Sequence, residues 1–294
     1  MPPSILVFGA ADPVGSALFR ELSHRQVPVW AFVDDQTQTE AIQGPLVSLI
    51  AGDLQDPASL DAALHGIDRV FVLSPAGPDQ VVLEGNVVEA IQRTRRPIHI
   101  VKVSALGTGP EAPIPLARGH AVTEAQIRNA GLPATLLRPH ALMQHLLTSS
   151  DTIRSDGLLF GAFGDVAVPF VDARDVAAVA ADVLTRGGHD GHFYTITGPQ
   201  ALSYTQVAAT LSSVLRTSVR YVDLPVERYH ETLVGTGHPT WWADNLTALA
   251  RWLQYDTAST VSSAVVEVTG RPARTLEQFI RDHRAAFTTT VARS

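Results

Sequence analysis

The sequence contains no cysteine among its 294 residues. This absence excludes disulfide bonds, thiolate metal sites and a cysteine nucleophile, and it fits a reducing cytoplasm, where we expect the protein to work. Long apolar runs are also missing, so we expect no segment that spans a membrane. The first apolar strand begins almost at the start of the printed sequence, and we expect no signal peptide.

Positive charge is scarce as well. Lys102 is the single lysine, and the 22 lysines and arginines face 29 aspartates and glutamates, which gives a formal net charge of -7. This balance argues against a nucleic-acid-binding surface. Hydrophobic residues make up 45% of the chain, enough for one large core and a smaller lobe. We expect a globular, enzyme-sized protein that binds a small molecule, and the sequence leaves a homo-oligomer open.

Apolar, β-branched runs recur along the first half of the chain. They lie at residues 5–8, 27–33, 46–50, 69–73, 98–103 and 134–137, and segments with helical spacing lie between them, notably at 81–91 and 122–129. Such alternation predicts an α/β fold, a doubly wound parallel Rossmann sheet covered by helices on both faces. We assign residues 1–140 to this dinucleotide-binding-type domain.

The pattern changes after residue 140. A glycine-rich stretch at 157–164 is followed by expected strands at 166–171 and 192–197 and by expected helices at 173–186 and 204–215, the last with Ser203 as its N-cap. We therefore expect a smaller, mixed α/β C-terminal substrate lobe over residues 141–294. It would share its core with the first domain, with a cleft between the two.

Residues 5–15 predict a strand, a tight turn and a helix. In Rossmann units the free amides and the dipole at the helix N-terminus hold a diphosphate. Gly9 and Gly15 take the outer positions of a GxxGxxG spacing, but Asp12 takes the middle one. Asp12-Pro13 is also a favourable helix start, in which the carboxylate occupies amides that a phosphate needs. We predict dinucleotide contacts, weakened or abolished by Asp12, from Gly9, Ala10, Ala11, Asp12 and Val14.

Asp34 ends the second expected strand. An acid about 20 residues beyond the glycine turn binds the adenosine ribose in NAD-type sites. If a nicotinamide cofactor binds, Asp34 and its neighbour Asp35 predict NAD over NADP. The alternative is that these two residues form an ordinary charged turn.

Further motifs follow in an order and spacing that resemble one family. They read GDLQD at 52–56, VKVS at 101–104, HAVTE at 120–124, GLPATLLRP at 131–139, DARDVA at 172–177 and YTITGP at 194–199. Over nearly its whole length the chain resembles the NmrA-like atypical short-chain dehydrogenases/reductases. That family includes NAD(P)H-dependent quinone reductases and redox-sensing regulators. The resemblance implies adenine contacts from Asp53 and Leu54 and a nicotinamide loop at Leu73 and Ser74.

The resemblance also places an active site. Where the wider superfamily carries Ser, Tyr and a Lys four residues later, this chain carries Ser104, His120 and Glu124. A four-residue spacing puts His120 and Glu124 on one helical face. Glu124 would then raise the pKa of His120 and keep it protonated as a proton donor. The alternative is an ordinary solvated helix pair.

Three more polar residues are candidates near the reacting groups. Period two puts Lys102 on the same side of its strand as Ser104, where it either forms an ion pair, with Glu124 or Asp53, or replaces the missing lysine at the ribose or substrate. His140 and His145 lie near the substrate wall that the resemblance implies, and add possible acid-base groups. Their spacing is poor for one helix face, so we expect no metal site. Four aromatic residues are candidates to cap a planar substrate: Trp241, Trp242, Tyr229 and Phe163. The alternative, favoured for at least one of the tryptophans, is packing in the core of a helical tail.

Three functions remain open at this point. The first is an NmrA-like oxidoreductase that reduces an aromatic or quinone-like molecule with NAD or NADP, NAD being favoured, and takes a proton from a histidine. The second is a cofactor-independent acid-base enzyme, an isomerase, dehydratase or cyclase that uses His120, His140 or His145. The third is a non-catalytic, dinucleotide-sensing regulator.

Overall fold

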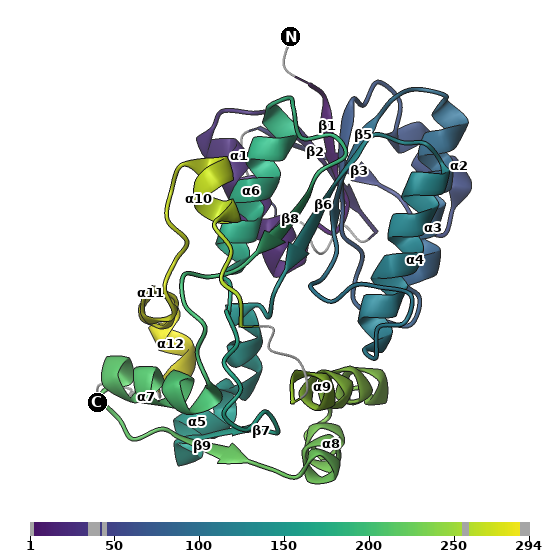
Figure 1. The fold of residues 1–294 in the computed structure, drawn as a ribbon. Coiled ribbons are helices and arrows are strands. Elements are labelled where there is room, and N and C mark those ends of the chain that lie inside the picture. The colour runs from purple at the N-terminus through teal and green to yellow at the C-terminus, as the bar shows by residue number, and fades with distance from the viewer. Residues whose placement is uncertain (1–2, 35–41, 43–45, 255–258, 289–294) are drawn as a thin grey trace.

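The computed structural model describes residues 3–34, 42, 46–254 and 259–288. Its centre is a seven-stranded sheet in the order β3-β2-β1-β4-β5-β6-β8, in which all neighbouring strands run parallel (Figure 1). The strands are β1 (Ile5–Val7), β2 (Val29–Val33), β3 (Val47–Ala51), β4 (Arg69–Val72), β5 (His99–Val103), β6 (Ala134–Pro139) and β8 (Phe193–Ile196). The predicted doubly wound Rossmann sheet is confirmed.

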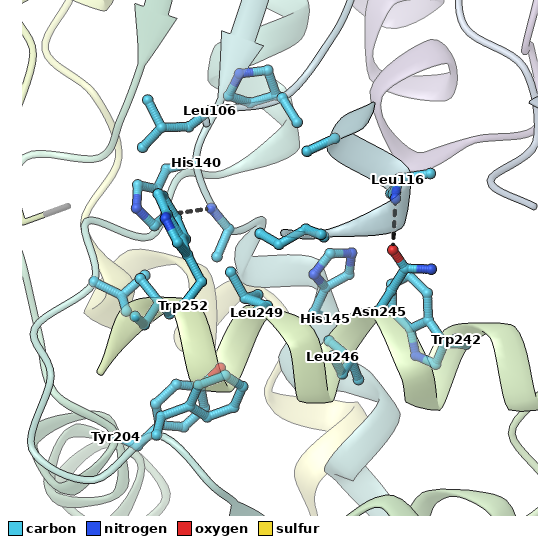
Figure 2. A pocket seen from close by; sticks show the side chains of 18 residues that line it. Leu106, Leu116, His140, His145, Tyr204, Trp242, Asn245, Leu246, Leu249 and Trp252 are labelled. Atoms are coloured by element: carbon cyan, nitrogen blue, oxygen red, sulfur yellow. Dashed lines mark hydrogen bonds between the residues drawn. The ribbon is translucent and has the colours of Figure 1, made fainter. Parts of the chain in front are cut away.

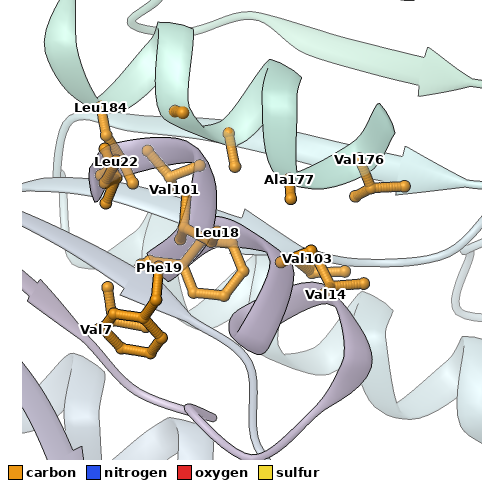
Figure 3. Packing of buried hydrophobic residues seen from close by; sticks show 14 of the residues in the cluster. Val7, Val14, Leu18, Phe19, Leu22, Val101, Val103, Val176, Ala177 and Leu184 are labelled. Carbon is orange, nitrogen blue, oxygen red and sulfur yellow. The ribbon is translucent and has the colours of Figure 1, made fainter. Parts of the chain in front are cut away.

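Helices cover both faces of this sheet (Figure 1). One face carries α1 (Pro13–His24), α6 (Ala173–Thr185) and α10 (Ala264–Thr269), and the other carries α2 (Pro57–Ala63), α3 (Gln80–Thr94) and α4 (Pro115–Asn129). Figure 3 shows Leu18 and Leu22 of α1 in one cluster with Val176 and Leu184 of α6 and the strand residue Val101. Because α6 is rich in alanine and buried almost all round, it packs closely against both α1 and the sheet.

The large sheet continues past residue 140. Strand β8 pairs with β6, and α6 packs on α1, so both elements complete the Rossmann layer although they follow the expected boundary. The boundary near residue 140 therefore stays a prediction about where the substrate lobe begins.

The second lobe packs around its own apolar cluster beyond the carboxyl ends of the strands (Figure 1). It contains a two-stranded parallel sheet of β7 (Leu158–Gly161) and β9 (Arg220–Asp223). Its helices are η2 (Met143–Ser149), α5 (Ser150–Asp156), α7 (Tyr204–Leu215), α8 (Val226–Gly235), α9 (Thr240–Leu253), α11 (Leu276–Asp282) and α12 (Arg284–Phe287). The expected mixed α/β architecture of this lobe is what the structure contains.

Two local expectations in this lobe have opposite outcomes. Ser203 caps α7 through a reciprocal capping box with Gln206, as predicted. The strand expected at 166–171 is wrong, because Val168 and Val171 form only isolated bridges, each to a different partner. No helix within the described ranges combines the length and apolarity needed to cross a membrane.

Candidate active site

The turn after β1 leaves no room for side chains at two positions. Gly9 has a φ of +82°, and a Cβ added there would lie 2.0 Å from the carbonyl oxygen of Leu73. A Cβ at Gly15 would lie 2.1 Å from the carbonyl oxygen of Gly9. Both positions therefore require glycine, which holds α1 tightly against the turn and the turn against the end of β4.

Asp12 caps α1. Its Oδ1 accepts a hydrogen bond of 2.8 Å from the amide of Val14, and Pro13 is the first helical residue. Burial raises the pKa of Asp12, although the bond from Val14 opposes that shift. The carboxylate thus occupies one donor that a diphosphate would use. The amides of Ala10 and Ala11 donate no hydrogen bond to other residues of the described ranges.

A cleft of about 390 Å³ opens beside this turn, at the carboxyl ends of the first strands. Three carboxylates, those of Asp12, Asp34 and Asp53, line it, and no lysine or arginine is among its described lining residues. The full lining is Gly9, Ala10, Ala11, Asp12, Phe32, Asp34, Asp53, Leu54, Gln55, Pro75 and Leu83. Seven of the predicted cofactor residues are therefore brought together here; Asp35 lies outside the described residues.

The other four predicted cofactor residues lie behind the lining of the cleft. Val14 is buried in the core, and Leu73 supports the glycine turn with its backbone. Ser74 donates its hydroxyl hydrogen bond to Glu84 over 3.3 Å. Lys102 is completely buried. Cofactor contacts from these four residues remain predictions.

Lys102 forms a buried ion pair with Glu84, at 2.8 Å between Nζ and Oε1, with both side chains at most 1% exposed. Its ammonium group also lies within hydrogen-bonding distance of the Val103 carbonyl oxygen and His120 Nδ1. These acceptors match the three N–H bonds of the ammonium group. An ion pair was one of the two expectations for Lys102, but Glu124 and Asp53 are the wrong partners. Its signal in the sequence was Glu84, one of two glutamates inside the segment 81–91.

His120 is neutral in this arrangement. Its Nδ1 lies 3.2 Å from Lys102 Nζ and 2.7 Å from Gln80 Nε2. A lysine only donates, so Nδ1 accepts and the imidazole proton sits on Nε2. Burial first, and then the charge of Lys102, hold the pKa of His120 well below its usual range. The expectation that Glu124 keeps His120 protonated is therefore wrong.

Glu124 belongs to a second cluster. Its Oε1 accepts from Ser104 Oγ over 2.7 Å, and Arg138 donates to both carboxylate oxygens over 3.0 and 2.5 Å. The bidentate contact from Arg138 is the geometry in which arginine binds carboxylates most strongly. Ser104 and Glu124 are thus brought together, while His120 faces the Lys102 pair instead.

His140 and His145 line a different cavity, of about 160 Å³, between the sheet edge and α9 (Figure 2). His145 contacts Trp242 edge-on, with ring centroids 5.4 Å apart. The remaining lining is Ala105, Leu106, Ile114, Leu116, Ala117, Pro139, Ala141, Phe163, Val168, Tyr204, Asn245, Leu246, Leu249, Trp252 and Leu253. Figure 2 shows His145 and the α9 side chains pointing into this space, which we call the aromatic cavity.

Two interactions hold the walls of the aromatic cavity. Asn245 Oδ1 accepts the backbone amide of Leu116 over 2.8 Å (Figure 2), so α9 satisfies a donor at the start of α4 that has no side-chain cap of its own. Phe163 stacks on Tyr204 with centroids 4.5 Å apart and ring planes within 8°. These contacts fix the cavity between the two halves of the molecule.

The predicted aromatic residues divide between the aromatic cavity and its surroundings. Trp242 and Phe163 line it, Trp241 lines a neighbouring cavity beside Gln80, and Tyr229 packs edge-on behind Phe163. Sequence reasoning missed Leu249 and Trp252. The recurrence of apolar residues at 242, 246, 249 and 253 is a helical periodicity that marks this face of α9.

Both histidines of the aromatic cavity have defined surroundings. His140 Nδ1 accepts from the Ala141 amide over 2.7 Å, so a neutral His140 carries its proton on Nε2. The side chains around His145 lower its pKa below the usual value, so it is uncharged at neutral pH although the residue is not fully enclosed. Among the residues with described coordinates, no group of three His, Cys, Asp or Glu side chains is arranged to hold a metal ion.

The NmrA-like family model matches residues 1–280. The chain belongs to this family. The NAD(P)H azoreductase of Xenophilus azovorans is 37% identical over 283 residues, which cover 96% of this chain and 99% of the azoreductase. The Escherichia coli NADPH-dependent quinone oxidoreductase, solved with NADPH, has a TM-score of 0.87 and 25% identity over 95% of this chain and 99% of its own. The Citrobacter triphenylmethane reductase, solved with NADP(H), has a TM-score of 0.82 and 26% identity at the same coverage.

A dinucleotide fits the cleft in three respects and conflicts with it in one. The glycines keep the turn narrow, the amides of Ala10 and Ala11 donate to no other described residue, and Asp34 lines the cleft directly after β2. The conflict is the Asp12 carboxylate, which accepts from the Val14 amide at the start of α1, a donor of the kind that holds a phosphate. The cleft can therefore hold a nicotinamide dinucleotide against a local electrostatic penalty.

Proposed function

We propose that this protein is an oxidoreductase that uses NAD(H) to reduce an aromatic or quinone-like small molecule. The observation that carries the proposal is the placement of two cavities along one edge of the sheet. The dinucleotide-type cleft lies at the carboxyl ends of β1 and β2, and the aromatic cavity lies at the ends of β5 and β6. A relative at 37% identity is named an NAD(P)H azoreductase, which supports this reaction class.

Each part of the cleft has a role in this proposal. The amides of Ala10 and Ala11 hold the diphosphate, Asp34 accepts from the adenosine ribose, and Asp53 and Leu54 contact the adenine. The bound nicotinamide supplies the hydride. A quinone that accepts one hydride and one proton becomes a hydroquinone, so the protein must also guide a proton to the substrate oxygen.

Two of the predicted histidines are candidates for this role. His140 and His145 face the aromatic cavity, whereas His120 is engaged with Lys102 and Gln80. We assign His140 the guiding of this proton, and His145 the role of a neutral wall residue. Ser104, Glu124 and Arg138 support the end of β5 beside it.

The cofactor preference in this proposal is NAD over NADP. The 2′-phosphate of NADP adds negative charge and is normally met by an arginine near the end of the second strand. The sequence from 34 to 45 contains no lysine or arginine, and the cleft already holds three carboxylates. Asp34 would repel the phosphate and accept from a free ribose hydroxyl instead.

Enzyme assays with matched titrations test this function. We expect 1,4-naphthoquinone to oxidise NADH, calorimetry to give at least tenfold tighter binding of NADH than of NADPH, and Asp34→Ala to reduce that ratio. Asp165→Ala, which removes an exposed aspartate of the other lobe, should leave the ratio unchanged. Tighter binding of NADPH by the wild type would overturn the NAD preference, and no oxidation of either cofactor with any quinone or azo compound would overturn the reaction class.

The Asp12 cap favours one alternative, in which the cleft stays without a nucleotide and His140 and His145 carry out acid-base chemistry in the aromatic cavity. That alternative predicts product without added cofactor, and a regulator predicts no product at all. The cytoplasmic location and a homo-oligomeric state remain predictions from the sequence.

A further inference from the structure

The described lining of the aromatic cavity carries no formal charge. None of the 18 lining residues with described positions is Asp, Glu, Lys or Arg. His145 is uncharged at neutral pH because its surroundings lower its pKa, and burial raises the pKa of Tyr204 well above its usual range. A charged group that entered this space would lose its hydration without gaining an opposite charge.

The polar lining groups are already engaged, or they are neutral donors and acceptors. Asn245 Oδ1 accepts a hydrogen bond from the Leu116 amide, and Asn245 Nδ2 donates one to the Trp241 carbonyl oxygen, over 2.8 Å in each case. His140 Nδ1 accepts a hydrogen bond from the Ala141 amide. The ion pair of Glu124 with Arg138 lies outside the described lining.

The size of the aromatic cavity limits how much of a substrate it covers. Its volume is about 160 Å³, and a dry apolar cavity of about 150 Å³ in another protein accepts benzene. The enclosed space therefore holds roughly one aromatic ring. A longer molecule must extend from the cavity toward solvent, where a charged substituent keeps its water.

We propose that the aromatic cavity receives one uncharged ring of a planar quinone or azo compound, and that it rejects a ring bearing a sulfonate, a carboxylate or a cationic group. Charge on a distal ring is tolerated. The inference rests on the proposed function for the identity of the substrate, but the discrimination itself is a property of the lining. It defines specificity by the charge of the inserted ring rather than by the charge of the whole molecule.

Three azo compounds with one ring skeleton test the inference directly. Azobenzene has two neutral rings, azobenzene-4-sulfonate has one, and azobenzene-4,4′-disulfonate has none. Binding is followed by quenching of tryptophan fluorescence with NAD+ present, so that no reduction takes place, because Trp242 and Trp252 line the aromatic cavity. We expect the first two compounds to bind within about tenfold of each other, and the disulfonate to bind at least 100-fold more weakly.

Two sets of variants locate the effect. Leu249→Arg places a cation in the lining and should raise the affinity for the disulfonate at least tenfold. Gln254→Arg adds the same charge at an exposed position just beyond α9 and should leave that affinity unchanged. Quenching by azobenzene should fall in Trp242→Phe and persist in Trp30→Phe, since Trp30 lies on β2.

The outcomes separate the two proposals. Equal binding of the disulfonate and azobenzene by the wild type, or azobenzene quenching that Trp242→Phe leaves unchanged, overturns the ring-charge rule whether or not the compounds are reduced. Binding that follows the rule, without reduction when NADH replaces NAD+, supports the rule and counts against the proposed reaction. The wild-type comparison requires no variant to fold.

Discussion

The two cavities along the sheet edge use opposite means of recognition. The cleft beside the glycine turn is lined by the backbone of Gly9, Ala10 and Ala11 and by three carboxylates, whereas the described lining of the aromatic cavity is mostly apolar and without formal charge. Ligand binding in the Rossmann half is thus expected to depend on close approach to the backbone and on charge. Ligand binding at the second lobe is expected to depend on shape and desolvation. Variants that alter one side and leave the other intact can separate these contributions.

The largest effect is expected at the buried ion pair of Lys102 with Glu84. Lys102 and Glu84 are buried behind the Pro75 loop of the cleft and beside α4, whose Ala117 lines the aromatic cavity. Lys102→Met leaves the Glu84 carboxylate buried without its cation and should lower the free energy of unfolding by about 3–5 kcal/mol. Urea denaturation measures the change.

The double variant Lys102→Met/Glu84→Leu is the control for that prediction. Because it removes both charges, it should regain at least half of the lost stability. A single variant within 0.5 kcal/mol of the wild type would show that the ion pair does not support the wall between the cavities.

The second-largest effect is expected for a substitution that abolishes NADH binding and preserves azobenzene binding. Gly9→Ala forces a Cβ to within 2.0 Å of the Leu73 carbonyl oxygen at a φ of +82°. We expect a loss of about 3 kcal/mol in stability, with NADH binding too weak to detect by calorimetry and the affinity for azobenzene preserved. Gly77→Ala, where an added Cβ meets nothing within 4 Å, should change neither quantity; loss of both ligands in Gly9→Ala would contradict the separation.

The third prediction changes the charge of the cleft without changing the shape of the side chain at position 12. Asp12→Asn keeps the oxygen that accepts from the Val14 amide and removes the negative charge. Coulomb's law at about 4 Å gives about 1–4 kcal/mol, so NADH should bind about fivefold to a thousandfold more tightly. Calorimetric titration, with Asp165→Asn as the control, tests this; an unchanged affinity would mean that Asp12 moves away from the diphosphate.

Asp12 also predicts a pH dependence. Burial raises its pKa in the folded protein, so the native state binds the proton more tightly than the unfolded state does. The contribution of this group to stability is therefore greatest at low pH and is lost as the pH rises from the unfolded value through the raised folded value. NADH affinity should fall over the same range as the carboxylate ionises. Asp12→Asn should remove both slopes, and slopes that persist in the variant would assign them to other groups.

The smallest effect concerns the aromatic side. Trp242→Ala removes an aromatic wall and should weaken azobenzene binding about tenfold, or about 1.4 kcal/mol, while NADH affinity stays the same. Trp241→Ala, its neighbour outside the aromatic cavity, should change azobenzene binding less than twofold. Equal losses in the two variants would contradict the assigned lining.

Local sequence chemistry predicted the parts of the site that depend on neighbouring residues. The Asp12-Pro13 helix start, the glycine turn and the Ser203 cap follow from backbone preferences over three or four positions, and the structure contains each of them. The parallel sheet followed from the alternation of apolar runs with helical segments, because burial on both faces leaves a repeated signature.

Partners from distant elements could not be predicted in the same way. The spacing of His120 and Glu124 allowed a pair on one helical face, but Arg138 and Ser104 from adjacent strands bind the glutamate, and Lys102 faces the histidine. The rotation of α3, which brings Glu84 to Lys102, is set by the packing of the whole helix. The strand expected at 166–171 failed because a strand needs a partner, which no single segment specifies.

The two halves of the molecule are joined at several places along the chain. After the second lobe is largely complete, Ser262 returns to bind Thr195 and Thr197, α10 packs beside α6, and Arg274 pairs with Asp175. A ribosome therefore releases the first 140 residues before it has made the helix that covers α1 and the strand that closes the sheet. We expect a fragment truncated there to keep an uncovered apolar face and to depend on chaperones, since the nucleotide-binding half completes its folding only when nearly the whole chain has emerged.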